Sequence, residues 1–347
     1  MSDNREKTIP RPGYLHRLFS PELDWIQVEV TTFCNARCIY CPHTIFREKW
    51  ANRHLPIDAF KRILSAASRT QLIYLQGWGE PFMNPDFFAM AEMAKKAGCR
   101  VGVTTNGMLL DDNVIWTLVR QQIDVVAFSL AGSDEMNDTY RKGTRLETVL
   151  RAIRELNREK EANKSIRPAI HIAYLLLNSA FDSLQKLPRL LDNAGVAQVV
   201  ISTLDLVLGK ELEREAVRPR TNDEYEKVRA RLDAIAAEAG RLNIDVHYQI
   251  RHPGKRRPVC TENVLRALFV SADGRVSPCV FTNLPLSDAA ARMVEANGRP
   301  LEPLTFGNVS EQSLSRIWRT RTYAAFRHSH AAGKAAICRE CPKLFIG

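Results

Sequence analysis

Three cysteines near the start of the chain could hold a metal centre. Cys34, Cys38 and Cys41 have the spacing Cys-x3-Cys-x2-Cys. Cysteine thiolate is the usual protein ligand of iron–sulfur clusters, so three thiolates on one loop can hold three irons of a [4Fe–4S] cluster and leave the fourth iron open to another molecule. Structural zinc normally has four protein ligands. His43 could supply the fourth, so zinc is the alternative at this loop.

A second group of cysteines lies in the last third of the chain. It consists of Cys260, Cys279 and a Cys-x2-Cys pair, Cys338 and Cys341. Four thiolates can complete the coordination of either an iron–sulfur cluster or zinc, and spacing does not distinguish the two. The remaining cysteine, Cys99, stands alone at the end of an expected helix. We interpret it as a core residue, because isolated cysteines are often buried.

The composition is that of a globular protein of 347 residues, 45% hydrophobic, with a formal net charge of +10. No apolar run approaches the roughly 18 residues that a membrane span needs. The polar start, MSDNREK, has no secretory signal, so we expect a cytoplasmic protein with reduced cysteines. The basic charge suits an anionic partner. No nucleic-acid-binding motif accompanies it, so nucleic acid is not the expected partner.

Expected strands and helices alternate through the first two hundred residues. The strands are predicted at 26–31, 72–76, 101–105, 125–130, 170–177 and 197–203. This order predicts a parallel sheet, either open and doubly wound or curved into a full or partial barrel, with the site on the loops after the strands. The fifth strand is almost continuously apolar, which predicts that it is covered on both faces.

The pattern changes after residue 207. A charged connector leads to a capping box at Thr221 and Glu224, which predicts a helix through residue 239. A strand over 244–250 follows. The segment 267–281 predicts a hairpin that turns at Asp273-Gly274. A helix is expected over 314–326, before the last two cysteines.

The first cysteine loop resembles the signature loop of the radical S-adenosylmethionine (radical SAM) enzymes. Tyr40 matches the aromatic residue that usually precedes the third cysteine. The resemblance implies that Cys34, Cys38 and Cys41 hold a [4Fe–4S] cluster whose fourth iron is chelated by the amine and carboxylate of SAM. It also implies that one-electron reduction cleaves SAM to a 5′-deoxyadenosyl radical.

Further segments resemble the same family in the same order. Gly77-Trp78-Gly79-Glu80-Pro81 is similar to the family's Gly-Gly-Glu-Pro motif with Trp78 inserted in place of its first glycine, and also to the form found in maturases of tungsten-cofactor oxidoreductases. The backbone of 77–79 is a better acceptor for the methionyl ammonium than Glu80. An arginine fork suits the SAM carboxylate. The SAM-binding candidates that the resemblance implies are Gly77, Gly79, Glu80, Asn106, Ser129, Arg141 and Asn178.

The second cysteine group lies in a segment that resembles the SPASM domain of radical SAM enzymes. The full SPASM pattern has seven cysteines and two auxiliary clusters, whereas four cysteines here imply one auxiliary [4Fe–4S] cluster, as in shortened SPASM and twitch domains. The implied α/β fold is a partial (β/α)6 TIM-like barrel with a small cysteine-rich C-terminal domain. The predicted parts are an N-terminal extension (1–24), the barrel (25–207), a connector helix and strand (208–250) and the SPASM-like domain (251–347).

These observations predict a radical SAM oxidoreductase or maturase. An auxiliary cluster bound entirely by protein suits electron transfer and favours a net oxidation, which we expect on a peptide or protein substrate. The alternatives are cofactor or small-molecule biosynthesis (pterin–metal cofactor maturation, haem modification or sugar dehydrogenation) and, from another class, a non-catalytic iron–sulfur carrier. Flavodoxin or ferredoxin is the expected electron donor. No catalytic acid or base is assigned. His171 and Tyr174 lie on the fifth predicted strand; one of them could point into the barrel, and the alternative is a packed core role.

Overall fold

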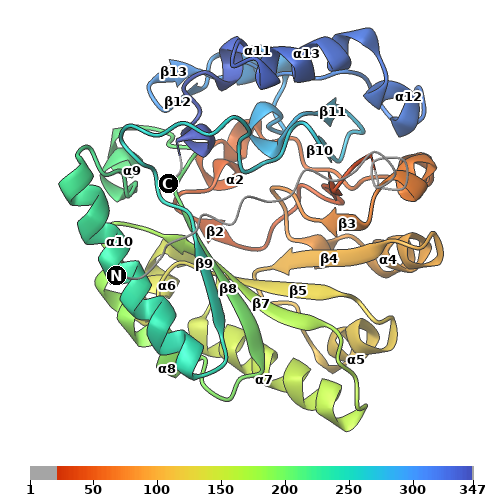
Figure 1. The fold of residues 1–347 in the computed structure, drawn as a ribbon. Helices are drawn as coiled ribbons and strands as arrows, with labels where there is room; N and C mark the ends of the chain where they lie inside the picture. Colours follow the sequence, from red (N-terminus) through yellow and green to blue (C-terminus); the bar gives the residue numbers. More distant parts are fainter. Residues whose placement is uncertain (1–21, 346–347) are drawn as a thin grey trace, which may run out of the picture.

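The architecture is that of one long, mostly parallel sheet with helices around it and a helical cap at the C-terminal end (Figure 1). The computed structural model describes residues 22–345, so almost all of the expected extension at 1–24 lies outside the described residues. The sheet has the order β11-β10-β1-β3-β4-β5-β7-β8-β9. Its strands are β1 Trp25–Val28, β3 Leu72–Leu75, β4 Arg100–Thr105, β5 Val125–Leu130, β7 Ala169–Leu176, β8 Val196–Thr203, β9 Asp245–Tyr248, β10 Ala267–Val270 and β11 Val276–Ser277.

The strand order decides between the two predicted sheet types. The strands from β1 to β9 are neighbours in the order of the sequence and pair in parallel. A doubly wound sheet would reverse its order at a switch point. The structure therefore has the partial-barrel form. Its main helices are α3 Ile57–Ile63, α4 Phe87–Lys96, α5 Asp112–Arg120, α7 Leu146–Ala162, α8 Leu187–Leu190 and α10 Asn222–Arg241.

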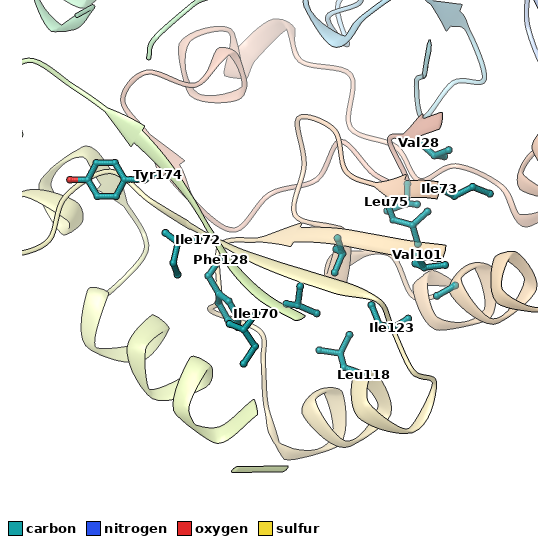
Figure 2. Close-up of a cluster of buried hydrophobic side chains, with 14 of the residues drawn as sticks. Val28, Ile73, Leu75, Val101, Leu118, Ile123, Phe128, Ile170, Ile172 and Tyr174 are labelled. Carbon is teal, nitrogen blue, oxygen red and sulfur yellow. The ribbon is translucent and has the colours of Figure 1, made fainter. Parts of the chain in front are cut away.

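Strands β1, β3 and β7 bury the side chains of one face, as alternating side chains allow, whereas all four residues of β10 are buried and none of β9 is. Figure 2 shows the core between the sheet and its helices, where Ile170, Ile172 and Tyr174 of β7 lie with Phe128 of β5. The expectation that β7 is covered on both faces was wrong. Its alternate residues, such as His171, are only half-buried because they face the interior of an incomplete barrel. Tyr174, by contrast, has the core role that was the alternative for these two side chains.

Three strands beyond the predicted six extend the same sheet. β9 adds to β8 in parallel, and β10 adds to β1 in parallel at the other edge. β10 and β11 form the predicted hairpin, with Gly274 at φ +83° in its turn. The predicted boundary at residue 250 therefore separates two strands of one sheet, and it stays a prediction.

Short elements complete the chain. The expected helix over 314–326 is two helices, because Thr320 caps a new helix through Tyr323 N. No helix in the described part of the chain is long and apolar enough to span a membrane. The remaining elements are β2 Arg37–Cys38, α2 Pro42–Ile45, α6 Glu135–Tyr140, β6 Arg141–Lys142, α9 Lys210–Glu215, α11 Asp288–Arg292, β12 Glu295–Ala296, β13 Arg299–Pro300, α12 Leu314–Trp318 and α13 Arg321–Ala331.

Candidate functional site

The three N-terminal cysteines lie on one compact loop that follows β1. Cys38 belongs to β2, and Cys41 is the N-cap of α2, with its backbone N–H donating to Cys38 O at 3.1 Å. Burial raises the pKa of Cys34 to about 11 and that of Cys41 to about 12, and the neighbouring Cys38 thiolate adds to both shifts. Because such repulsion requires proximity, the structure brings the three predicted ligands together.

Arg141 connects this loop to the rest of the barrel. It pairs with Cys38 across the short β2–β6 ladder, and its side chain is only 6% exposed. Its Nη1 donates to the Tyr40 hydroxyl at 2.7 Å, whereas its Nε has no partner among the residues that the structure describes. A buried charged donor without an acceptor is costly. A guanidinium with a free donor, beside three thiols, fits an anionic ligand such as the SAM carboxylate.

Glu80 and Asn106 position the loop from within the protein. Glu80 is 2% exposed; its carboxylate accepts from Thr105 Oγ1 at 2.8 Å and from the Asn106 backbone N–H at 2.7 Å. The Asn106 side chain donates to Asn35 Oδ1 at 2.7 Å, directly after the first cysteine. Burial raises the pKa of Glu80 to about 7, although these hydrogen bonds lower it. Its oxygens are engaged inside the protein, which supports the preference for the 77–79 backbone as the ammonium acceptor.

The two motif glycines are needed for packing between loops. A Cβ on Gly79 would lie 2.3 Å from Thr31 O, and one on Gly77 would lie 2.3 Å from Cγ of Glu29. The sequence alone suggests that these glycines let the backbone approach a ligand. The structure adds a different reason, because protein atoms fill the side on which each Cβ would project.

Glu29 is a functional candidate that the sequence reasoning missed. It follows β1, is fully buried, and accepts from Trp78 N at 2.8 Å through Oε1 and from Ala272 N at 3.1 Å through Oε2. Burial raises its pKa to about 7, although both backbone hydrogen bonds lower it. One carboxyl group therefore joins the Gly77–Pro81 loop to the β10–β11 turn. An acid inside the apolar run IQVEV was the available signal.

Trp78 makes a second connection between the same regions. Its Nε1 donates to Asn283 O at 3.1 Å, and its ring meets the edge of Phe281 with centroids 6.2 Å apart. Phe281 lies two residues after Cys279. The residue that departs from the family's motif is thus the one that contacts the segment carrying the second cysteine group.

We expect Trp78→Phe to lower the free energy of unfolding by about 1 kcal/mol, since it removes one half-buried hydrogen bond and keeps the ring. Urea unfolding measures the change. Trp116→Phe is the matched control, because Trp116 is 47% exposed on α5. Equal stabilities of the Trp78 and Trp116 variants would show that the bond to Asn283 contributes nothing.

The other SAM-binding candidates lie in two places. Ser129 is half-buried on the face of β5 that points into the barrel, opposite the core residues Phe128 and Leu130. Asn178 is exposed after β7, and its Nδ2 donates to Arg214 O at 3.1 Å. The structure therefore places Ser129 where a ligand in the barrel could reach it, whereas Asn178 is held by the connector before α10.

The four C-terminal cysteines also come together. Cys260 and the half-buried Cys279 and Cys338 share one small cluster, and burial, then repulsion by Cys341 and Cys260, raises the pKa of Cys338 to about 12. Three of the four line a cavity of about 340 Å³. In the described part of the chain no three His, Cys, Asp or Glu side chains converge on a point where one metal ion would sit. A four-iron cluster spreads its cysteines over different irons.

Two further predictions about single residues can be compared with the structure. Cys99 is 3% exposed, with Sγ 3.6 Å from Ala67 O, which confirms it as a core residue. His43 is buried with its ring against the edge of Trp50, at 5.4 Å between centroids. Burial, then the charge of Arg47, lowers its pKa.

Comparisons with known families match both halves of this architecture. Residues 28–172 match the family described as the Radical SAM superfamily, and residues 260–342 match the SPASM iron–sulfur cluster-binding domain. The first match covers the cysteine loop and the strands through β7. The second begins at Cys260 and ends one residue after Cys341, so it includes all four C-terminal cysteines.

Individual relatives cover most of the chain. It is 26% identical over 335 residues to the tungsten-containing aldehyde ferredoxin oxidoreductase cofactor-modifying protein of Pyrococcus furiosus, spanning 92% of this chain and 87% of that protein. It is 23% identical over 299 residues to the PqqA peptide cyclase of Gluconobacter oxydans, spanning 84% and 75%. The structure of Streptococcus suis SuiB bound to S-adenosylmethionine matches with a TM-score of 0.66 at 13% identity, over 94% and 72% of the chains, and shows a shared fold.

Proposed function

The chain belongs to the radical SAM superfamily and carries a C-terminal SPASM domain, and from this we propose that it cleaves SAM reductively and oxidatively modifies a peptide or protein. The observation that carries the proposal is the pairing of two cysteine groups, one of three beside a buried arginine and one of four in the cap. The radical SAM domain implies a [4Fe–4S] cluster and SAM, and the SPASM domain implies an auxiliary cluster. Cys34, Cys38 and Cys41 would hold the first; Cys260, Cys279, Cys338 and Cys341 would hold the second.

When bound, the first cluster supplies the electron that converts SAM to a 5′-deoxyadenosyl radical. The protein's own contribution is orientation and exclusion of water. Arg141 would bind the SAM carboxylate with its free Nε, and the 77–79 backbone would accept from the ammonium group. Glu80 and Asn106 position those loops, and Ser129 faces the interior where the adenosine part would lie. Asn178 is also proposed to contact the adenosine; its side chain donates to Arg214 O at 3.1 Å.

A peptide substrate is supported by the names of relatives that cover most of this chain. The PqqA peptide cyclase acts, by its name, on a peptide. SuiB shares the fold. Its structure bound to the precursor peptide SuiA matches this chain with a TM-score of 0.63. An auxiliary cluster held by the four C-terminal cysteines would supply the electron acceptor that an oxidative modification needs.

Cofactor maturation is the second candidate, favoured by one observation. The relative that spans 92% of this chain is a cofactor-modifying protein. Substrate-dependent formation of 5′-deoxyadenosine separates the two candidates, with short peptides in one series and oxidisable small cofactors in the other. Stimulation by small molecules alone would exclude the peptide proposal.

The metal content of the cap tests the auxiliary site. We expect Cys338→Ala/Cys341→Ala to lower iron from about eight to about four atoms per chain, since one of two four-iron clusters is lost. Elemental analysis of anaerobically reconstituted protein measures iron and zinc together. Cys99→Ala is the matched control, because Cys99 is a core cysteine with no proposed ligand role. Loss of zinc with unchanged iron would contradict the auxiliary cluster at these residues.

An acidic flavodoxin or ferredoxin is the proposed electron donor. Among the basic residues of α12–α13, Arg327 is engaged, with its guanidinium 3.8 Å from the Trp318 ring and Nη1 donating to Trp318 O at 3.0 Å. Arg321 is exposed, and Arg319 is 3.7 Å from Glu22. We expect Arg319→Glu/Arg321→Glu to slow flavodoxin-driven turnover while dithionite-driven turnover is unchanged. Equal effects on both would count against docking at these helices.

A further inference from the structure

A large basic cavity is lined by residues of α9, of the start of α10 and of the segment between them, and its lining contains no cysteine. Its volume is about 770 Å³, within the range of small-molecule sites. Five cationic side chains line it against two carboxylates, Glu213 and Glu224. The cations are Arg214, Arg218, Arg220, Lys227 and Arg251. The lining thus has a net charge of +3, because five cations exceed two carboxylates by three.

Two of these arginines are held together although they repel each other. Arg218 and Arg251 are both half-buried. Burial lowers the pKa of Arg218, and the charge of Arg251 is the next cause in the same direction; Asp205 and Glu213 offset it in part. Within the described residues, neither guanidinium forms an ion pair with a carboxylate: Arg218 donates to Asn297 Oδ1, and Arg251 lies over the Phe345 ring at 5.3 Å. Like charges in a half-buried wall are stabilised when an anion lies between them.

The cavity adjoins the proposed reaction region on two sides. Asn178, on its wall, follows β7 at the carboxyl edge of the sheet, where sites of barrel proteins lie. Asn297, the partner of Arg218, also lines the 340 Å³ cavity that contains Cys279, Cys338 and Cys341. Arg218 therefore links the wall of the basic cavity to the wall of the cavity that contains these three cysteines.

We propose that this cavity binds an anionic group of the substrate, a phosphate or a carboxylate, with Arg218 and Arg251 as its central ligands. This inference rests on the proposed function, since it names the chemistry of the molecule that the enzyme modifies. Arginine forks bind both groups through two parallel hydrogen bonds. The more exposed Arg214, Arg220 and Lys227 extend the positive field toward solvent and attract the anion.

Isothermal titration of the anaerobically reconstituted protein tests the site without using catalysis. The probes are pyrophosphate and a peptide of six glutamates, each titrated into wild type, Arg218→Gln/Arg251→Gln and Arg229→Gln. Arg229 is the matched control: it is an arginine of α10 that pairs with Glu226 outside the cavity. We expect the double variant to bind the preferred probe at least about tenfold more weakly than wild type, and the control to match wild type.

Each outcome bears on the proposal. Tighter binding of pyrophosphate assigns the site to a phosphorylated molecule, and tighter binding of the peptide assigns it to acidic carboxylates. If wild type binds neither probe, or if Arg229→Gln weakens probe binding as much as the double variant does, the proposed site is wrong. If the double variant unfolds, Arg214→Gln/Lys227→Gln replaces it, because both side chains are exposed, and weakening of about threefold is expected. If the protein binds the anion but forms no 5′-deoxyadenosine, the proposed function is rejected while the anion-binding site is still supported.

Discussion

Glu29→Ala is expected to lower the free energy of unfolding by about 2–4 kcal/mol near pH 6 and to weaken SAM binding. The carboxyl group accepts from Trp78 N and Ala272 N, and both N–H groups lose their acceptor in the variant. The Gly77–Pro81 loop also loses the side chain against which Gly77 packs. Urea unfolding measures the stability, and equilibrium dialysis of reconstituted protein measures SAM affinity.

The buried Glu29 carboxyl also predicts a pH dependence. Its pKa is raised from 4.5 to about 7, so the native state binds its proton more tightly than the unfolded chain does. This contribution to stability is fully present below about pH 4.5 and is lost as the pH rises to about 7. Relative to Glu29→Gln, which cannot titrate, wild type should lose about 2–3 kcal/mol between about pH 5 and pH 8.

The Gln variant serves as the control for shape, because it keeps the side-chain length and one acceptor oxygen. Glu80 has a similarly raised pKa, and it contributes equally to both proteins, so the difference between them isolates Glu29. A constant stability difference across this pH range would contradict a protonated, buried Glu29. A normal SAM affinity in Glu29→Ala would show that the loop keeps its position without this contact.

Arg141→Met is expected to raise the dissociation constant for SAM at least about tenfold, as a charge-assisted hydrogen bond to the carboxylate is lost. The free Nε of this buried guanidinium is the proposed donor. Methionine keeps the apolar stem of the side chain and removes the charge. Arg141→Lys should recover only part of the affinity, because an ammonium group cannot bind a carboxylate in two places.

Arg145→Met is the matched control for this prediction. Arg145 lies four residues away as the exposed N-cap of α7, so the substitution removes the same charge from a place outside the site. Equilibrium dialysis gives both affinities. Equal SAM affinity in the Arg141 and Arg145 variants would show that Arg141 acts only through its bond to Tyr40.

The sequence was sufficient for the barrel strands because short apolar runs alternate with segments of helical periodicity. It could not show that β9 and β10 join the two edges of the same sheet, since pairing between strands far apart in sequence has no local periodic signal. The prediction that the fifth strand is covered on both faces was wrong for a related reason. Alanine and leucine on its inner face are apolar, yet they line an open interior, so hydrophobicity alone overstated its burial.

The candidate site also contains residues that the sequence could predict and residues that it could not. The cysteines could be predicted because their type and spacing suit a metal cluster, and Arg141 could be predicted from the resemblance of its segment to the radical SAM family. Glu29 could not, because its partners are backbone N–H groups at Trp78 and Ala272, and backbone donors leave no trace in a sequence. The contact of Trp78 with Asn283 likewise depends on a distance of 205 residues along the chain.

Formation of 5′-deoxyadenosine is the most direct measurement of the central proposal. The protein is purified and reconstituted without oxygen, given SAM and dithionite, and the nucleoside is quantified by mass spectrometry beside the Cys34→Ala/Cys38→Ala/Cys41→Ala variant. We predict nucleoside from wild type and none from the variant. Iron-loaded wild type that binds SAM, with peptides and small cofactors present, and still forms no nucleoside would contradict radical SAM catalysis and support an iron–sulfur carrier.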